Sequence, residues 1–355
     1  MVKKIFLEDG DSYEPIFLII SIILFVIVLY FVFNGSINIS NDRFSCGDGT
    51  RDGFCSDIKP YYCSNEVLVE RASYCGCSEN TTIEGDSCIS KYQKNPFNIT
   101  LKYYLNGEQK NLNVTLYKGL VDYLSKVPRE ITYKEGETPP TISDFELKKI
   151  NEEYQKQLLL PIVIQIENLD KDKTNQMRIA VSIVQNLDWG FSNKTLIFGS
   201  NKIPYSRYPY EVLYDSQGVC GEKSELLAFL LKELGFDVSL FYNQFENHES
   251  VGIKCPDKYS WHNSGYCFVE TTGPSIITDS SIVYVGGVKI TSKPELIPVS
   301  NGTSLGDNLY EYLDAIDMMN IRKKIEDTGK INSLDKSRLD ELTAKYGLVK
   351  EYNTA

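Results

Sequence analysis

The sequence predicts an α+β fold in which a helix that begins at a cysteine packs on an antiparallel β-sheet. Residues 218–235 have the sequence GVCGEKSELLAFLLKELG, where Gly235 is a typical helix stop and one apolar stripe is formed by Leu226, Leu227, Leu230, Leu231 and Leu234. Runs with the alternation of β-strands follow at 236–242, 248–255 and 266–272, and a further strand is expected at 282–290.

The N-terminal segment predicts a membrane anchor. Residues 16–33, IFLIISIILFVIVLYFVF, carry no charge and are long enough to cross a hydrocarbon core of roughly 30 Å as a helix. The leader, 1–15, has two lysines and four acids, and no small-residue cleavage site follows Phe33, unlike a signal peptide. We therefore expect an uncleaved transmembrane helix over 16–33, in contact with the lipid bilayer.

Six cysteines lie within 43 residues of a Gly/Asp/Ser-rich stretch: Cys46, Cys55, Cys63, Cys75, Cys77 and Cys88. Their even number and the sparse apolar sequence predict a small module, 34–92, that is held by three disulfides. A zinc site is the alternative, but the stretch has no histidine and its only close pair is C-x-C. The connectivity stays open, because six cysteines allow many pairings.

Disulfides favour an oxidising compartment, and seven N-x-S/T sequons suggest a glycoprotein: Asn34, Asn38, Asn80, Asn98, Asn113, Asn193 and Asn301. Together they predict a single-pass protein of the cell membrane with a cytoplasmic N-terminus and an extracytoplasmic main domain.

The middle of the chain predicts further elements in order. Two alternating runs flank Asn106-Gly107 in a β-hairpin segment, 93–127, and a Pro/Thr/Glu-rich linker follows at 128–144. Helical spacing is found at 145–158 and 176–187, and 161–167 either continues the first helix or forms a short strand. These elements open a domain over 145–304, after which a charged helical segment, 305–355, packs peripherally or stands between partners.

The last three cysteines predict one bridge and one free thiol. Cys255 and Cys267 flank a short loop between two predicted strands, which suits a disulfide across a hairpin. Cys220 is then unpaired at the start of a helix, where backbone N–H groups and the helix dipole stabilise a thiolate.

Two other residues complete a candidate site. His248 opens one predicted strand and Glu270 lies on the next. If Cys255 and Cys267 bond on one face of these strands, then alternation places His248 and Glu270 together on the other face. An imidazole can take the thiol proton, and a carboxylate behind it orients the ring and stabilises its charge.

The segments GVCGEKSELLAFLLKELG, HESVGIKC and CFVETT resemble the core motifs of the transglutaminase-like superfamily. The resemblance covers roughly residues 145–290 and implies a papain-like core, with Cys220 as nucleophile, His248 as base and Glu270 as third member. The usual acid is Asp, so Glu270 changes the reach of that side chain. IVQNLDW and YPYEVLY resemble upstream segments of archaeal members, and the six-cysteine module after an anchor resembles archaeal membrane proteins with this domain.

The function expected from this site is cleavage or transfer of a peptide or carboxamide acyl group through a thioester, acting on a protein or peptide substrate at the cell surface. The backbone N–H of Cys220 is one natural oxyanion donor, and Gln185 or Trp189 is a candidate for the second. No cofactor or metal is implied, and a net charge of −11 argues against a nucleic-acid partner.

Two alternatives stay open. The domain is a catalytically silent binding or scaffold module, or the cysteine-rich module is a recognition head and the larger domain its scaffold.

Overall fold

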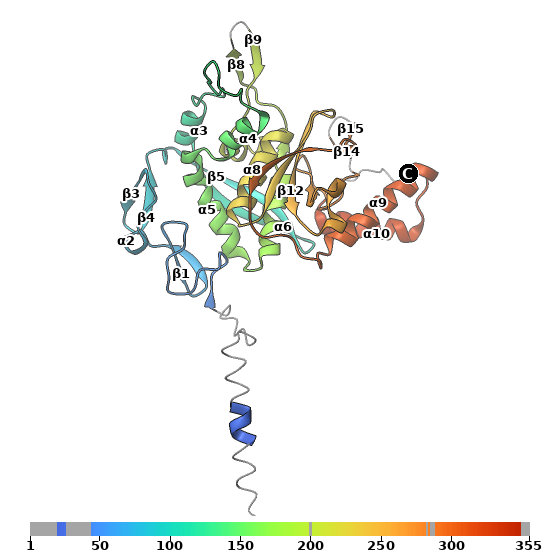
Figure 1. The fold of residues 1–355 in the computed structure, drawn as a ribbon, viewed down its shortest axis with the longest axis horizontal. Coiled ribbons are helices and arrows are strands. Elements are labelled where there is room, and N and C mark those ends of the chain that lie inside the picture. Colours follow the sequence, from blue (N-terminus) through green and yellow to red (C-terminus); the bar gives the residue numbers. More distant parts are fainter. Residues whose placement is uncertain (1–19, 26–43, 199–200, 282, 285–287, 349–355) are drawn as a thin grey trace, which may run out of the picture. The chain divides into compact units, whose positions relative to one another are not determined.

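The computed structural model describes residues 20–25, 44–198, 201–281, 283–284 and 288–348. The chain divides into two compact units, Met1–Phe44 and Ser45–Ala355, and the second has a mixed α/β fold (Figure 1).

The predicted membrane anchor needs correction. In the first unit, the described residues 20–25 are helical. Nowhere in the described ranges is a helix both long and apolar enough to cross a membrane. This finding contradicts the transmembrane helix in the predicted fold class, and with it the predicted single-pass location in the cell membrane. The remainder of the predicted span, 16–19 and 26–33, and the leader 1–15 lie outside the described residues.

The centre of the second unit is a four-stranded antiparallel sheet with the strand order β13-β12-β11-β16. Its strands are β11 (Val238–Asn243), β12 (His248–Lys254), β13 (Tyr266–Val269) and β16 (Glu295–Ser300). The strand expected at 282–290 is not the fourth member. That segment forms a separate pair, β14 (Val283–Tyr284) with β15 (Val288–Lys289), while Ile297 of β16 is buried opposite Leu240.

Helix α8 (Cys220–Glu233) packs on β11 and β12, and its apolar stripe enters the main core. The helix ends before Gly235, whose φ of 88° is accessible to glycine at little cost. Four further helices surround it: α4 (Ile142–Ile150), α5 (Glu153–Leu169), α6 (Lys173–Gln185) and α7 (Pro209–Asp215). Because of this packing α8 also buries polar residues, namely Glu222, Lys223, Ser224 and Glu225.

The predicted helix at 145–158 is divided between α4 and α5. Pro161 lies inside α5, so 161–167 continues the helix instead of forming a strand. After α6, the two-residue strand β7 (Asp188–Trp189) pairs in parallel with β10 (Gln217–Gly218), directly before the cysteine helix. The described part of the next segment forms a hairpin, β8 (Thr195–Phe198) with β9 (Asn201–Pro204), which projects at the top of Figure 1.

The expected hairpin around Asn106-Gly107 is present as β5 (Pro96–Leu105) and β6 (Glu108–Tyr117). Both turn residues have positive φ, 53° and 80°, as tight hairpin turns require. The hairpin and the following α3 (Lys118–Leu124) share one hydrophobic core with α5, α6, α8 and the central sheet. The domain boundaries predicted from the sequence stay predictions.

The cysteine-rich segment has little regular structure and is cross-linked by Cys46–Cys63, Cys55–Cys75 and Cys77–Cys88. Its elements are β1 (Tyr61–Ser64), β2 (Val67–Glu70), α2 (Ala72–Cys75), β3 (Thr81–Glu84) and β4 (Ser87–Ser90). A fourth disulfide, Cys255–Cys267, joins β12 to β13 across a loop that contains two short 3-10 turns, Asp257–Tyr259 and Trp261–Asn263.

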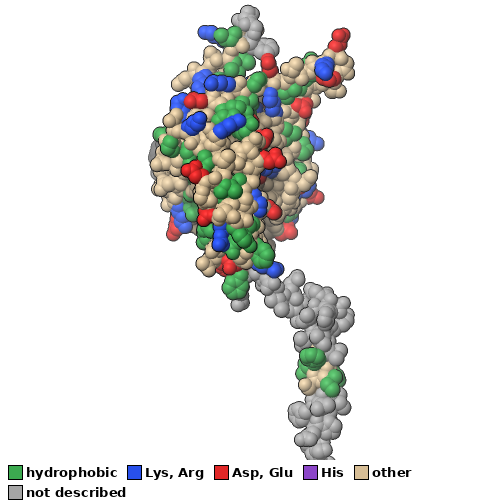
Figure 2. Space-filling view, turned by 90° about the vertical axis from the view of Figure 1, so that its left-hand side faces the viewer, with side chains coloured by type: hydrophobic (Ala, Val, Ile, Leu, Met, Phe, Trp, Pro, Cys, Tyr) green, Lys and Arg blue, Asp and Glu red, His purple; other side chains and the backbone are tan. Residues whose placement is uncertain are grey.

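The C-terminal segment forms two helices, α9 (Glu311–Thr328) and α10 (Ser333–Tyr346), which turn at Gly329. Two ion pairs anchor α9: the partly buried pair Arg178–Glu311 to α6, and the buried pair Arg322–Asp279 to the segment after β13. On the face drawn in Figure 2, acidic and basic side chains are interspersed with scattered hydrophobic ones.

Candidate active site

Cys220 is the first residue of α8 and is partly exposed and not in a disulfide. Residue Val219 has an extended backbone, so the chain turns into the helix at the cysteine itself. The backbone N–H groups of a first helical turn have no acceptor within the helix. Cys220 therefore lies at the positive end of the helix dipole, where a thiolate is stabilised.

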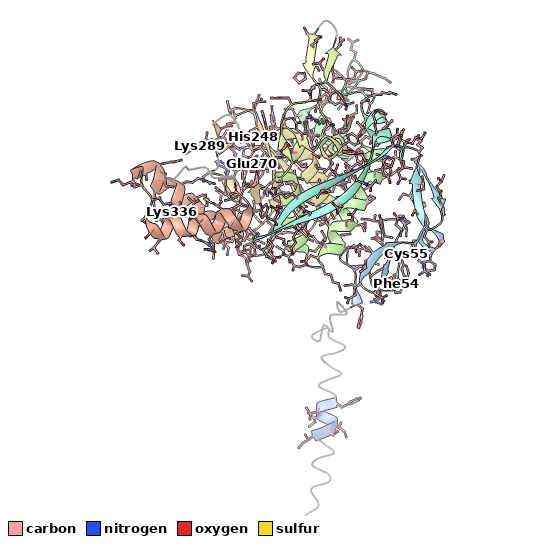
Figure 3. All side chains as sticks on the ribbon, turned by 180° about the vertical axis from the view of Figure 1, so that it is seen from behind. Phe54, Cys55, His248, Glu270, Lys289 and Lys336 are labelled. Atoms are coloured by element: carbon pink, nitrogen blue, oxygen red, sulfur yellow. A yellow bond between two sulfur atoms is a disulfide. The ribbon has the colours of Figure 1, made fainter. Side chains whose placement is uncertain are left out.

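His248 begins β12, and Glu270 directly follows β13 (Figure 3). Nε2 of His248 donates to Oε2 of Glu270 at 2.9 Å, and both side chains are almost completely buried. The other carboxylate oxygen of Glu270 accepts from the backbone N–H of Thr271 at 2.9 Å and from the N–H and hydroxyl of Thr272 at 2.8 and 2.7 Å. This arrangement leaves Nδ1 as the ring nitrogen that can face a thiol.

The electrostatics of the three groups favour a thiolate–imidazolium pair. Burial raises the pKa of Cys220, but the hydrogen bond and charge of His248, with the N–H groups of Glu249 and Gly221, outweigh burial and lower it. Burial lowers the pKa of His248, but contacts with Cys220 and Glu270 raise it to about 9. Burial raises the pKa of Glu270, and His248 with Thr272 bring it below its usual value.

A cleft of about 410 Å³ opens over Cys220 and His248. Its other lining residues are Trp189, Phe191, Val219, Gly221, Tyr242, Glu246, Asn247, Glu249 and Thr272. Trp189 and Phe191 are 39% and 61% exposed and meet edge to face at 5.3 Å between ring centres. The cleft therefore joins the Cys220 thiol to an exposed aromatic wall.

The two residues predicted as oxyanion donors are placed differently. Trp189 lines the cleft, whereas Gln185 does not. The side-chain amide of Gln185 is buried and donates to the backbone oxygen of Glu270 at 2.9 Å and to both oxygens of Ser275. Gln185 thus holds the segment that carries the acid.

Two supporting residues, Lys223 and Ser224, were missed from the sequence. Lys223, one turn below Cys220 on α8, donates to the backbone oxygens of Leu187 at 2.8 Å and Thr272 at 3.1 Å. The Ser224 hydroxyl bonds the backbone oxygen of Glu249 and the hydroxyl of Thr271. The visible signal was a run of polar residues, Glu222 to Glu225, at helix positions next to the nucleophile.

A buried acidic cluster lies beside the site. Glu146, Glu225 and Glu249 surround the ammonium of Lys149, which forms ion pairs with the first two. Burial, and then the charge of Glu146, raise the pKa of both Glu225 and Glu249 well above the usual range. Glu249 also lines the cleft, so this buried cluster reaches the wall of the candidate site.

Within the described ranges, no group of three or more His, Cys, Asp and Glu side chains is arranged to hold a metal ion.

No known family model matches the chain, and the comparison with curated proteins returns no match. Among solved structures, the chain has a weak similarity to calcium-bound LapG of Legionella pneumophila. The two are 16% identical with a TM-score of 0.20, over 49% of this chain and 98% of that one. This TM-score is far below that of a shared fold. The interpretation of the site therefore depends only on the geometry described above.

Proposed function

We propose that this protein is a cysteine peptidase, amidase or acyltransferase of the transglutaminase-like kind, with Cys220, His248 and Glu270 as its catalytic residues. The observation that carries the proposal is a free, partly exposed cysteine at a helix N-terminus whose pKa is lowered by a histidine that is hydrogen-bonded to a buried carboxylate.

The proposed reaction has two steps. The thiolate of Cys220 attacks the carbonyl carbon of a peptide or carboxamide, the protonated His248 gives its proton to the leaving nitrogen, and the C–N bond breaks to leave a thioester. A water molecule or a primary amine then attacks the thioester while His248 takes its proton. The C–S bond breaks, and the acid or the new amide is released with the thiolate restored.

We assign the oxyanion site to the backbone N–H of Cys220 and the indole N–H of Trp189. The first lies at the open end of α8, and the second belongs to a partly exposed side chain that lines the cleft. Gln185 is not part of this proposal, because its amide group is committed to Glu270 and Ser275. Loss of one oxyanion donor lowers turnover by about 10²–10³ fold in enzymes of this chemistry.

The proposed substrate is an extended peptide with an apolar or aromatic side chain next to the reacting carbonyl. Trp189, Phe191 and Tyr242 line the cleft beside Cys220, and exposed aromatic surface of this kind gains free energy when an apolar group covers it.

The test is a peptide-library digest by the oxidised, full-length protein, with and without an added primary amine, read by mass spectrometry. Cleavage products or amine adducts that Cys220→Ala abolishes support the proposal. His248→Ala should lose at least about 10² fold, as removal of a general base does, while His262→Ala, the exposed second histidine, should keep full activity. Products that persist in Cys220→Ala, or a wild-type protein that makes none, would instead favour the scaffold alternative.

A further inference from the structure

Lys223 is a lysine in a place where lysine is rarely found. Its side chain is completely buried within the core of the second unit, three residues after Cys220 and on the same side of α8. Removing an ammonium group from water costs several kcal/mol unless nearby groups compensate. A reason for the charge must therefore lie in its surroundings.

The ammonium connects three parts of the site. It donates to the backbone oxygen of Thr272, two residues after Glu270, and to the backbone oxygen of Leu187, two residues before Trp189. The helix of the nucleophile is in this way tied both to the segment of the acid and to the strand β7 on the rim of the cleft.

Two carbonyl oxygens alone do not require a charge, because the amide group of a glutamine offers two N–H donors without the cost of burying an ion. The positive charge of Lys223 is explained by the charges of the other groups at the site. In its reactive form the site holds two anions, the thiolate of Cys220 and the carboxylate of Glu270, and one cation, the protonated His248. The ammonium of Lys223 offsets the negative charge that remains on these three groups.

We propose that Lys223 is a positioning residue of this site: it holds the Glu270 segment against the helix of Cys220 and supplies the counter-charge that keeps Glu270 ionised. Through Glu270 it maintains the protonated His248 and hence the thiolate. This proposal rests on the proposed function, because it treats Cys220 as the nucleophile. It concerns the ionisation of the Cys220 thiol, so it can be tested without a substrate.

The charged groups that face Lys223 are consistent with this role. Glu270, from the end of β13, and Asp188, from β7, both attract the ammonium, while burial lowers the pKa of Lys223 to about 8. Glu222 of the same helix is engaged by Arg207 at 3.0 Å. Near neutral pH the lysine is therefore mostly charged.

The experiment measures how fast iodoacetamide alkylates Cys220 between pH 4 and 9 in the oxidised, full-length protein. We compare wild type with Lys223→Gln, which keeps two donors without the charge, and Lys223→Met, which removes both. Each variant should raise the pKa of the Cys220 thiol by about one unit. At pH values below the midpoint of the wild-type profile, alkylation should therefore be about tenfold slower than in wild type. Lys232→Gln, at the other end of α8, is the matched control and should leave the profile unchanged.

Urea unfolding of the same variants separates the two roles. If both variants are less stable but their alkylation profiles match wild type, Lys223 only fills a structural place and the proposal is wrong. If Lys223→Gln has the alkylation profile of wild type and only Lys223→Met is shifted, then the hydrogen bonds of Lys223 matter and its charge does not. That result would refute the proposed counter-charge.

If neither variant folds, the coupling between Lys223 and Glu270 is measured by changing Glu270 and following the pKa of Lys223. Removing the charge of Glu270 must lower the pKa of Lys223, because the free energy of coupling is reciprocal. The ¹³Cε NMR titration of Lys223 in Glu270→Gln should show this decrease, and an unchanged titration would contradict the proposal. All of these measurements concern the thiol and the lysine, so a protein without turnover still tests them.

Discussion

Glu270 is completely buried, yet its carboxylate accepts four hydrogen bonds, from His248, Thr271 and twice from Thr272. Hydrogen bonds to the charged form stabilise it, which explains why the pKa of Glu270 is lowered despite burial. The longer side chain of glutamate, compared with aspartate, still places one oxygen on the histidine and the other on the threonines.

Replacing Glu270 with Gln should shift the titration of His248. The pKa of His248 is raised from 6.5 to about 9, so the protonated ring stabilises the fold fully below pH 6.5, and this stabilisation is lost as the pH rises through about 9. Without the carboxylate charge, the loss should occur at lower pH, and alkylation of Cys220 at pH 7 should slow by about 10–100 fold. NMR of the His248 ring and alkylation kinetics measure both effects. Thr272→Val, which removes one of the four hydrogen bonds, should give a smaller shift in the same direction.

Glu249 is predicted to destabilise the protein at high pH. Its pKa is raised by burial and by Glu146, so stability should fall as the pH rises from its usual range through the raised value. Glu249→Gln removes the cost of ionising this buried carboxyl group. The variant should therefore have a higher Tm than wild type at pH 8, by about 2–4 °C for each kcal/mol regained. Near pH 4 the two Tm values should be nearly equal. Thermal unfolding against pH measures it. Glu295→Gln, an exposed glutamate of β16, should leave Tm unchanged, and an equal rise in both variants would contradict the explanation.

Among the elements, α9 supports the site from a distance. The segment from Glu270 to Asp279 is held at one end by Gln185 and at the other by the ion pair of Asp279 with Arg322. Both members of this pair are buried, and Arg322 also donates to Ser281. The C-terminal helices are therefore packed into the second unit and help to fix the position of the acid.

Arg322→Met should leave the buried carboxylate of Asp279 without its guanidinium and destabilise the protein by about 3–5 kcal/mol. The double variant Arg322→Met with Asp279→Leu should recover much of this loss, because no isolated charge remains buried. Urea unfolding of the single and double variants measures the coupling. An exposed pair, Lys289 with Glu326, is the control, since such pairs contribute roughly 0–1 kcal/mol. A double variant less stable than the single one would show that the charge is not the cause.

On the scale of the whole molecule, disulfides link segments that local structure leaves apart. Cys255–Cys267 joins β12, which begins with His248, to β13, which directly precedes Glu270. Cys77–Cys88 closes a loop of similar length, 11 against 12 residues, in the cysteine-rich segment. The two bridges form a matched pair, one joining the strands that position His248 and Glu270 and one within the cysteine-rich segment.

Replacing both members of either bridge with Ala should cost about 3 kcal/mol, since loops of this length lose similar entropy when closed. Only the Cys255→Ala and Cys267→Ala variant should also slow the alkylation of Cys220, because it loosens the strands that hold His248 and Glu270. Unfolding and alkylation of both double variants measure the two effects. Equal alkylation in both would show that the central sheet keeps its register without the bridge.

Features that depend on neighbouring residues could be predicted from the sequence. The positive φ values at Asn106 and Gly107, the helix stop at Gly235 and the unpaired Cys220 at a helix start follow from the chemistry of a few adjacent positions. The alternation of strands also sets His248 and Glu270 on one face, and the structure brings them to 2.9 Å. The apolar run at 16–33 shows the limit of such local patterns, because no helix of the described residues is both long and apolar enough to cross a membrane.

Only the tertiary structure decided which distant residues meet. The cysteine pairing, the choice of β16 as the fourth strand, the turn of Gln185 away from the cleft and the buried bonds of Lys223 join segments far apart in the chain. Side-chain hydrogen bonds act over about 3 Å, so their partners are known only once the backbone has placed them. The sequence by itself determined the local elements and the chemistry available at Cys220. Packing determined which buried charges orient and balance it, because the free energy of a buried charge depends on every group around it.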